Sequence, residues 1–416
     1  MISFTGRVVL VTGAGHGIGA SHARELAARG ASVVVNDLGS AVDGRPDGTD
    51  PAAGLAAELT RDGHAAVASH HDVAAPEGGR AMVDLALDRF GRLDAVIHNA
   101  GNRRNRPVGR TTPEDLDALL AVHLKGALHV AQPAFAVMRD QGYGRLLVTG
   151  SGAGMFGNDG QCAYAAAKAG AFGLARALAV EGAPHGVTAN VLLPTAATER
   201  SMAGLSRQAR TSLGSARSGF AAAATPRSVT ALALYLVSEQ CTLTNRVFGA
   251  AAGRYYEAFV GTTPGWRAPA PATPDDVAAH LDEILDRDGY LVPARLGDDL
   301  AASMRPPAPS GRDLVGAYFA AVHARDAAAL RDLFAPDARV ELPGRVLDGA
   351  DAITGYYRDL FARVAPAPRP GPVATADGTA AVQVELRLGD ATASMVDLFT
   401  HARGRITRLR VYRHAA

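Results

Sequence analysis

Cysteine, net charge and long apolar runs are all scarce in this chain of 416 residues. Its two cysteines, Cys162 and Cys241, are too few for a disulfide framework and favour a reducing compartment. The formal net charge of +1 provides no global field to attract nucleic acid or a membrane surface. No apolar run approaches the roughly 18 residues of a membrane span, and residues 1–6 lead directly into a strand pattern without room for a signal peptide. We therefore expect a cytoplasmic protein with no nucleic-acid partner and no membrane partner.

The first 250 residues have an alternating pattern. With 48% hydrophobic and 20% charged residues the chain has a globular composition, and its length suggests two or three domains. From Arg7 to about Gly253, short β-branched runs alternate with helical stretches such as residues 18–29, 113–138 and 164–181, which is typical of βαβ units. Strands are expected at residues 8–11, 32–36, 65–69, 95–99, 145–149, 188–192 and 246–248. The predicted fold is therefore α/β, a doubly wound parallel sheet.

The composition changes after Gly253. Residues 263–273 are rich in proline and alanine, 274–287 have the pattern of one helix, and 304–311 (MRPPAPSG) have that of a linker. Helical patterns follow at 313–334 and 350–363, with strand patterns at 338–342, 380–388, 391–400 and 405–413. The predicted domains are a Rossmann domain at 1–262, a helical extension with a Pro-rich linker at 263–311, and a smaller α+β domain at 312–416.

A glycine-rich segment joins the first strand to the first helix. Glycines let backbone amides approach a pyrophosphate at a helix N-terminus, although a tight turn without ligand has the same pattern. Asp37 ends the second strand, 24 positions after Gly13. A carboxylate there binds ribose hydroxyls and repels a 2′-phosphate, so NAD is favoured over NADP, while Arg45 or a protonated His16 would soften this preference. Asp72 could lie near the adenine or simply at a solvated turn. The expected binding residues up to the third strand are Gly13, Gly15, His16, Gly17, Ile18, Gly19, Asp37, Asp72 and Val73.

Tyr164 and Lys168 are the first candidates for catalysis. Their spacing of four places both side chains on one helix face. A phenol is a poor base at neutral pH, but an adjacent ammonium lowers its pKa, and Lys168 has further donors for a ribose. Ser151, at the end of a strand, could donate to a substrate oxygen as charge develops. Tyr-x-x-x-Lys is also a common surface pattern, so it needs the support of other motifs.

Taken together, these motifs resemble the short-chain dehydrogenase/reductase family. Residues 12–19 (TGAGHGIG), residues 98–101 (HNAG), Ser151 and the Tyr164/Lys168 pair follow in that family's order and spacing, over roughly the first 255 residues. The resemblance implies a Rossmann fold, NAD(P) and a homodimer or homotetramer. We expect no metal ion. The resemblance also implies that Tyr164 is the general acid/base, that Ser151 orients the substrate and that Lys168 lowers the tyrosine pKa. The remaining cofactor-binding residues that it implies are Asn99, Ala100, Gly101, Tyr164, Lys168 and Pro194.

A finer resemblance points to (3R)-hydroxyacyl-CoA dehydrogenase-like members. It is carried by residues 34–39 (VVNDLG), 122–126 (VHLKG), 143–145 (YGR) and 157–161 (GNDGQ). Those relatives oxidise 3-hydroxyacyl thioesters or hydroxysteroids.

Three places need a separate interpretation. His123 replaces the asparagine that helps carry a proton-relay water in many family members, and either a relay or a packing role is open. Pro194 is followed by threonine where the family usually has glycine, which alters the loop over the nicotinamide. A basic loop could meet the phosphates of a carrier thioester or be solvated. Its arginines are Arg103, Arg104, Arg106 and Arg110.

The C-terminal domain resembles the SnoaL-like and ketosteroid-isomerase superfamily. Tyr318, residues 333–344, residues 396–399 and residues 404–406 carry this resemblance, which implies a cone-shaped α+β fold with an apolar pocket. Tyr318 and Asp397 fall on that isomerase's oxyanion-binding pair, whereas its proton-shuttling aspartate falls on Leu342. Because leucine cannot move a proton, this isomerase mechanism is not expected, and the pair could equally be plain pocket residues.

The sequence supports one leading hypothesis and two rivals. The first is an NAD-dependent oxidoreductase that interconverts a hydroxyl and a keto group on a bulky small-molecule or carrier-bound acyl substrate. Its C-terminal domain would bind or further transform the same molecule. The second is a dehydrogenase fold used for non-redox chemistry, with the SnoaL-like domain as dehydratase, cyclase or isomerase. The third makes the C-terminal domain a dimerisation module only.

Overall fold

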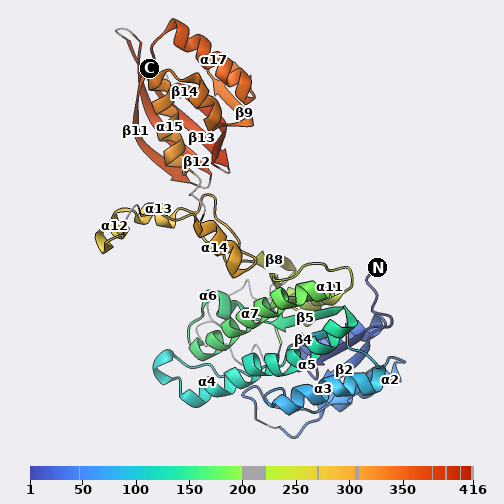
Figure 1. The fold of residues 1–416 in the computed structure, drawn as a ribbon. Coiled ribbons are helices and arrows are strands. Elements are labelled where there is room, and N and C mark those ends of the chain that lie inside the picture. Colours follow the sequence, from blue (N-terminus) through green and yellow to red (C-terminus); the bar gives the residue numbers. More distant parts are fainter. Residues whose placement is uncertain are drawn as a thin grey trace. The chain divides into compact units, whose positions relative to one another are not determined.

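The computed structural model describes residues 1–45, 47–198, 222–268, 271–304, 309–376, 378–388, 391–402 and 404–413. The chain forms two compact units, Met1–Phe259 and Val260–Ala416 (Figure 1). The first ends close to the predicted boundary at residue 262, and the second includes the predicted extension. No helix in the described ranges combines the length and the hydropathy that crossing a membrane requires.

The first unit is built on one eight-stranded sheet. Its order is β3-β2-β1-β4-β5-β6-β7-β8, and every neighbouring pair is parallel except β7 and β8. The strands are β1 (Val8–Thr12), β2 (Ser32–Asn36), β3 (Ala66–Ser69), β4 (Ala95–His98), β5 (Gly144–Thr149), β6 (Val187–Thr195), β7 (Val247–Ala251) and β8 (Arg254–Ala258). The predicted doubly wound fold is confirmed, and β8 is an antiparallel edge strand that the sequence reading missed.

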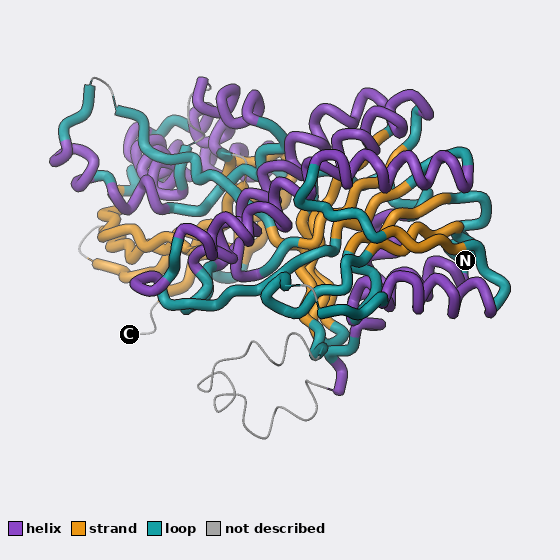
Figure 2. Tube along the Cα trace, turned by 90° about the horizontal axis from the view of Figure 1, so that it is seen from below, coloured by secondary structure: helices purple, strands orange, loops and turns teal. Residues whose placement is uncertain are grey.

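Helices cover both faces of this sheet, as the strands between purple helices in Figure 2 show. They are α1 (Gly17–Ala28), α2 (Pro51–Arg61), α3 (Pro76–Phe90), α4 (Pro113–Leu120), α5 (Gly126–Gln141), α6 (Gly152–Phe156), α7 (Cys162–Gly182) and α11 (Pro226–Val237). Helices α1, α2 and α11 pack on one face, and α3, α5 and α7 on the other. In β1, Val9 and Val11 enter the first core while Val8 and Leu10 enter the second. Burial on both faces explains the unbroken apolar run of this strand.

One predicted helix has an interruption that matters for the site. The expected helix at 113–138 is α4, then a π-helical turn (Ala121–Lys125), then α5. Such turns are frequent at functional sites because they change the direction of one or two side chains. This turn carries His123.

The second unit contains a mixed six-stranded sheet of order β10-β9-β14-β13-β12-β11, in which only β9 and β14 pair in parallel. Its strands are β9 (Phe334–Leu342), β10 (Arg345–Asp348), β11 (Ala367–Ala376), β12 (Thr379–Leu388), β13 (Ala391–Ala402) and β14 (Arg405–Arg413). Its helices are α12 (Pro274–Ala279), α13 (Leu281–Leu285), α14 (Leu296–Met304), α15 (Gly311–Ala324), α16 (Ala327–Leu333) and α17 (Ala350–Arg363). The core lies between this sheet and α15–α17 and includes Tyr318, Phe334, Tyr357 and Phe399. The predicted α+β class is confirmed.

Two predicted helices in this unit are wrong in length. The helix expected at 274–287 is divided at His280, where α12 ends and α13 begins. The helix expected at 313–334 is divided after Ala324, because Arg325 has a left-handed φ of 55°. A capping box between Ser310 and Asp313 starts α15 and is visible in the sequence.

Candidate active site

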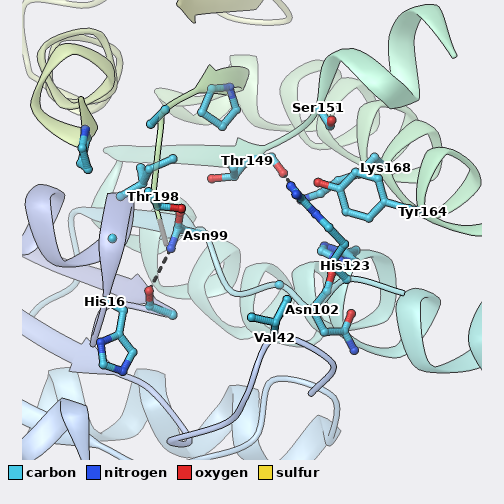
Figure 3. Close-up of a pocket in the computed structure, with 18 of the residues that line it drawn as sticks. His16, Val42, Asn99, Asn102, His123, Thr149, Ser151, Tyr164, Lys168 and Thr198 are labelled. Carbon is cyan, nitrogen blue, oxygen red and sulfur yellow. Dashed lines mark hydrogen bonds between the residues drawn. The ribbon is translucent and has the colours of Figure 1, made fainter. Parts of the chain in front are cut away.

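The carboxyl ends of the central parallel strands surround a cavity of about 670 Å³ in the first unit (Figure 3). Parallel strands place their carboxyl ends at one edge, where open α/β sheets bind ligands. Ten of the residues expected to bind cofactor or to act in catalysis line this cavity. They are Gly13, His16, Gly17, Ile18, Asn99, Gly101, Ser151, Tyr164, Lys168 and Pro194.

The glycine-rich turn is held by close backbone contacts. Gly13 has a φ of 61°, and a Cβ there would lie 2.7 Å from the Cα of Ala100. At Gly19 a Cβ would lie 2.2 Å from the carbonyl oxygen of Gly13. Only glycine fits either position, so Gly19 and Ala100 shape the turn without lining the cavity.

Side chains of neighbouring strands fix the turn further. The Oγ1 of Thr12 accepts from the backbone amides of Asn99 and Ala100, both at 3.1 Å. The Nδ2 of Asn99 donates to the carbonyl of Gly13 at 2.9 Å. The β1 and β4 ends are therefore tied together beneath the cavity.

Asp37 lies beside this turn rather than in the cavity wall. Its carboxylate is buried and accepts from the amide of Gly15 at 2.9 Å and from that of Gly39 at 3.0 Å. Two amide donors leave further lone-pair positions on its oxygens. Asp37 is thus held at the end of β2 as an anionic acceptor.

Asp72 and Val73 lie after β3, and neither lines the cavity. The exposed Asp72 accepts from the amide of Ala74 at 2.8 Å, as a turn aspartate does. Val73 is buried, and its carbonyl accepts from His129 at 3.1 Å. The two roles predicted for Asp72, a position near the adenine and a solvated turn, therefore both stay predictions.

Ser151, Tyr164 and Lys168 meet at one end of the cavity (Figure 3). Ser151 caps α6, with its Oγ accepting from the amide of Ala153 at 3.2 Å, so its own hydrogen is left to donate. The Nζ of Lys168 is buried, donates to the Thr149 carbonyl at 2.5 Å and lies 5.9 Å from the centroid of the Tyr164 ring. Helix α7 positions the tyrosine and the lysine, and the β5 end positions the serine.

The pKa of Tyr164 is set by competing effects. Burial alone would raise it, but the Lys168 ammonium and then the Arg103 guanidinium outweigh burial and lower the pKa below its usual value. Hydrogen bonds to Ser151 and Arg103 lower it further. Burial and the nearby Arg103 charge lower the pKa of Lys168 as well, against the opposing effect of Tyr164.

Arg103 is a functional candidate that the sequence reading did not separate from its basic loop. Its guanidinium carbon lies 5.6 Å from the centroid of the Tyr164 ring, and it lines the cavity. Arg104 and Arg106 instead pair with the buried carboxylate of Asp115, at 3.7 and 2.7 Å. The four arginines thus do not act as one patch, and no pattern in the sequence distinguishes the one beside the tyrosine.

His123 packs against the catalytic tyrosine. The two rings are 5.3 Å apart, edge to face, and Nε2 of His123 bonds the Asn102 carbonyl at 2.8 Å. Its Nδ1 is buried with no partner among the described residues. Burial first, and then Lys168, lower the pKa of His123 well below its usual value. The ring is therefore neutral at physiological pH, and its Nδ1 has no hydrogen-bond partner among the described residues.

The candidate residues of the second unit lie in its core. The hydroxyls of Tyr318 and Tyr357 are 2.6 Å apart, and both rings are buried. Burial raises the pKa of Asp397 to about 7, and its Oδ1 has no partner among the described residues. Leu342 leaves no carboxylate at the position of the isomerase base, while neighbouring Glu341 pairs with Arg408 and Arg410.

A doubly wound sheet whose glycine turn opens beside a Ser-Tyr-Lys cluster defines a Rossmann-fold oxidoreductase. Residues 7–210 match the short chain dehydrogenase family, and residues 315–409 match the SnoaL-like domain. The chain belongs to the short-chain dehydrogenase/reductase family, whose members use NAD(P), and it carries a C-terminal SnoaL-like domain. Both predicted resemblances are confirmed.

Individual relatives support the same assignment. A short-chain type dehydrogenase/reductase of Mycobacterium tuberculosis is 39% identical over 283 residues, covering 68% of this chain and 95% of that protein. The peroxisomal multifunctional enzyme type 2 of Mus musculus is 39% identical over 289 residues, covering 68% of this chain but only 37% of that enzyme. A crystal structure of a short chain dehydrogenase from Mycobacterium avium is similar at a TM-score of 0.58 and 35% identity, covering 68% of this chain and 96% of that one.

Proposed function

We propose that this protein is an NAD-dependent oxidoreductase that interconverts a hydroxyl and a keto group on a bulky small-molecule or carrier-bound acyl substrate. The observation that carries the proposal is the cluster of Ser151, Tyr164 and Lys168 at one end of the cavity whose other wall is the glycine-rich turn. Hydride transfer needs a dinucleotide and a proton-transferring group within reach of the same carbon. This cavity offers residues for both.

The residues present fit a dinucleotide. The turn from Gly13 to Gly19 has no space for Cβ atoms at its ends and lies at the N-terminus of α1, where an anionic pyrophosphate is favoured. Asp37 beside it would accept from ribose hydroxyls and repel a 2′-phosphate, which supports NAD over NADP. When bound, the nicotinamide supplies the acceptor or donor of hydride.

The protein's own groups handle the proton. In the oxidative direction the Tyr164 phenolate accepts the proton of the substrate hydroxyl, and in the reductive direction its O–H returns that proton to the carbonyl oxygen. Lys168 stabilises the phenolate by its positive charge, which lowers the pKa of Tyr164. The Ser151 hydroxyl, which lies within hydrogen-bond reach of Tyr164, donates its hydrogen to the substrate oxygen as negative charge develops there.

The substrate class is proposed from a sequence resemblance and from the size of the cavity. Segments of this chain resemble hydroxyacyl-CoA dehydrogenase-like members, and the cavity of about 670 Å³ leaves room for a bulky substrate as well as part of a dinucleotide. We extend this to 3-hydroxyacyl thioesters, polyketide-like and steroid-like alcohols. A homodimer or homotetramer is proposed from the family alone.

The test is spectrophotometric. Purified protein is mixed with NAD or NADP and a panel of 3-hydroxyacyl thioesters and hydroxysteroids, and NADH absorbance is followed. We expect turnover that prefers NAD and falls by about 10²- to 10⁴-fold in Tyr164→Phe, the usual contribution of a general acid/base. NADH binding without turnover of any panel member in either direction would count against redox chemistry, as would full activity in Tyr164→Phe.

The buried cluster of the second unit supports a second candidate function. Asp397, with its pKa raised to about 7, can donate a hydrogen bond when protonated, and the Tyr318–Tyr357 pair supplies another hydroxyl donor. In this alternative the SnoaL-like domain performs dehydration, cyclisation or isomerisation in specialised metabolism, while the dehydrogenase fold serves non-redox chemistry. Loss of product formation in Asp397→Leu with intact NADH binding would favour a catalytic role for this domain.

A further inference from the structure

Arg103 differs from the neighbouring arginines of its loop because it lines the cavity and forms no ion pair with a described carboxylate. Its backbone amide donates to the Val42 carbonyl at 2.8 Å, which fixes where the side chain starts. The neighbouring Arg104 and Arg106 are paired with Asp115. The Arg103 guanidinium instead lies over the Tyr164 ring, with its central carbon 5.6 Å from the ring centroid.

The catalytic end of the cavity therefore carries an excess of positive charge. Lys168 is the second cation there, and the Arg103 charge contributes to the lowered pKa of Lys168. His123 is neutral, because burial lowers its pKa well below the usual value. Asp37 lies outside the cavity wall and is held by two backbone amides. Asp47 is the carboxylate among the described lining residues, and no ion pair joins it to Arg103 or to Lys168. Two cations without a described carboxylate paired to them favour an anionic ligand.

We propose that Arg103 binds a carboxylate of the substrate close to the carbon that reacts at Tyr164. This inference rests on the proposed oxidoreductase function but replaces its thioesters and steroid-like alcohols, which have no carboxylate near the reacting carbon, with hydroxy acids and oxo acids as the preferred substrates. A guanidinium has five donors, so Arg103 can keep its contact with Tyr164 and still offer a bidentate pair to a carboxylate. Burying a neutral group against this guanidinium would leave its charge uncompensated.

Arg103 also acts on Tyr164 itself, and the two roles make different predictions. A cation that only lowers the tyrosine pKa accelerates acidic and neutral substrates alike, because it acts on a group common to both reactions. A cation that binds a carboxylate changes the ratio between the two substrates. That ratio is therefore the informative quantity, since any loss through Tyr164 cancels in it.

The experiment compares 3-hydroxyoctanoate with its methyl ester as substrates for the full-length protein with NAD. We expect kcat/KM to favour the acid by about 10- to 100-fold in the unsubstituted protein, mainly through KM, as for one charge-assisted hydrogen-bonded pair. Arg103→Leu should bring the ratio close to one, and Arg103→Lys should retain part of it because the charge remains but the bidentate geometry is lost. Arg110→Leu, in the same exposed loop and without a described ion pair, is the matched control and should keep the ratio.

Binding of 3-hydroxyoctanoate to the protein–NADH complex, measured by calorimetry, separates the two proposals. Tighter binding of the acid than of the ester, weakened by about 10-fold or more in Arg103→Leu, supports the inference even if hydride transfer fails, a failure that would count against the proposed function alone. Equal binding of acid and ester, no binding of the acid, or an unchanged acid-to-ester ratio in Arg103→Leu would overturn the inference and leave Arg103 as a positioning residue for Tyr164.

Discussion

At the scale of single residues, the site depends on the positive charge beside Tyr164. Tyr164 is nearly inaccessible to water, and burial by itself would keep it protonated far above neutral pH. The Lys168 ammonium reverses this because it lies on the same helix face and is held by the Thr149 carbonyl. The reactivity of the tyrosine therefore depends on a neighbour four positions away.

Lys168→Met is expected to move the pH profile as well as the rate. Loss of the ammonium raises the pKa of Tyr164, and the oxidative reaction needs the phenolate, so the rising limb of kcat/KM against pH should shift to higher pH. At neutral pH we expect a loss of about 100-fold or more. Lys168→Arg keeps the charge and should move the limb less. An unshifted limb in Lys168→Met would show that another group is the base.

Asp397 gives a second residue-scale prediction, on stability. Its folded pKa of about 7 lies above its ordinary value of 3.8, so the native state binds the proton more tightly than the unfolded chain does. The stabilisation is complete below the unfolded pKa and is lost as pH rises to the folded one. Asp397→Asn should therefore raise the melting temperature of the second unit relative to the unsubstituted protein above pH 7 but not near pH 4. A difference that is the same at both pH values in differential scanning calorimetry would contradict this.

At the scale of elements, the turn between β1 and α1 tolerates no side chain at two of its glycines. A Cβ at Gly19 would meet the Gly13 carbonyl oxygen at 2.2 Å and the Asn99 amide at 2.5 Å. We expect Gly19→Ala to lower stability by about 1–3 kcal/mol and NADH affinity by at least about 10-fold, because the turn must open to relieve the overlap.

Gly54→Ala in α2 is the matched control for that substitution. A Cβ at Gly54 would meet nothing within 4 Å, and the residue lies inside a helix. Here alanine should stabilise the protein by about 0.5–1 kcal/mol without changing NADH binding. Denaturant unfolding and fluorescence titration of both variants measure the two effects, and equal behaviour of the two alanines would refute the steric argument.

The sequence predicted best those elements that combine a regular hydrophobic pattern with a turn residue at one end. The run from Val8 and the Gly-rich turn identify β1 and α1, and β14 has its predicted bounds. β11 was missed because it contains prolines at 368, 370 and 372. An edge strand with a bulge between Pro370 and Val373 accommodates them, and single-sequence rules exclude proline only from central strands.

The site residues also divide into those that the sequence predicts and those that it does not. Spacing along one helix predicts that Tyr164 and Lys168 share a face, and strand ends predict where Ser151 and Asn99 lie. The separation of Arg103 from Arg104 and Arg106 could not be predicted, because it depends on the buried Asp115. The π-helical turn at His123 also has no sequence signal of its own, since propensities do not distinguish it from an α-helix.

At the scale of the whole molecule, the described functional residues form two groups, one in each unit. The dehydrogenase cavity is lined by residues between Gly13 and Pro226, all in the first unit, and the Tyr318, Tyr357 and Asp397 cluster lies in the second. The relative from Mycobacterium tuberculosis has 95% of its length in the 283 matched residues, which leaves no room for a second domain of this size. The dehydrogenase part therefore occurs as a separate protein in that relative.

A chain that ends at Met304 tests what the second domain contributes. If the SnoaL-like domain helps to bind the substrate, truncation should raise the substrate KM while kcat and the KM for NAD stay within about 2-fold, because remote binding acts on the ground state and the transition state equally. Steady-state kinetics of both chains measures this, with light scattering to follow the oligomer. Unchanged kinetics with a smaller oligomer would make the domain an assembly module. A fall in kcat at an unchanged KM would instead mean that the second unit contributes to the transition state of the hydride transfer.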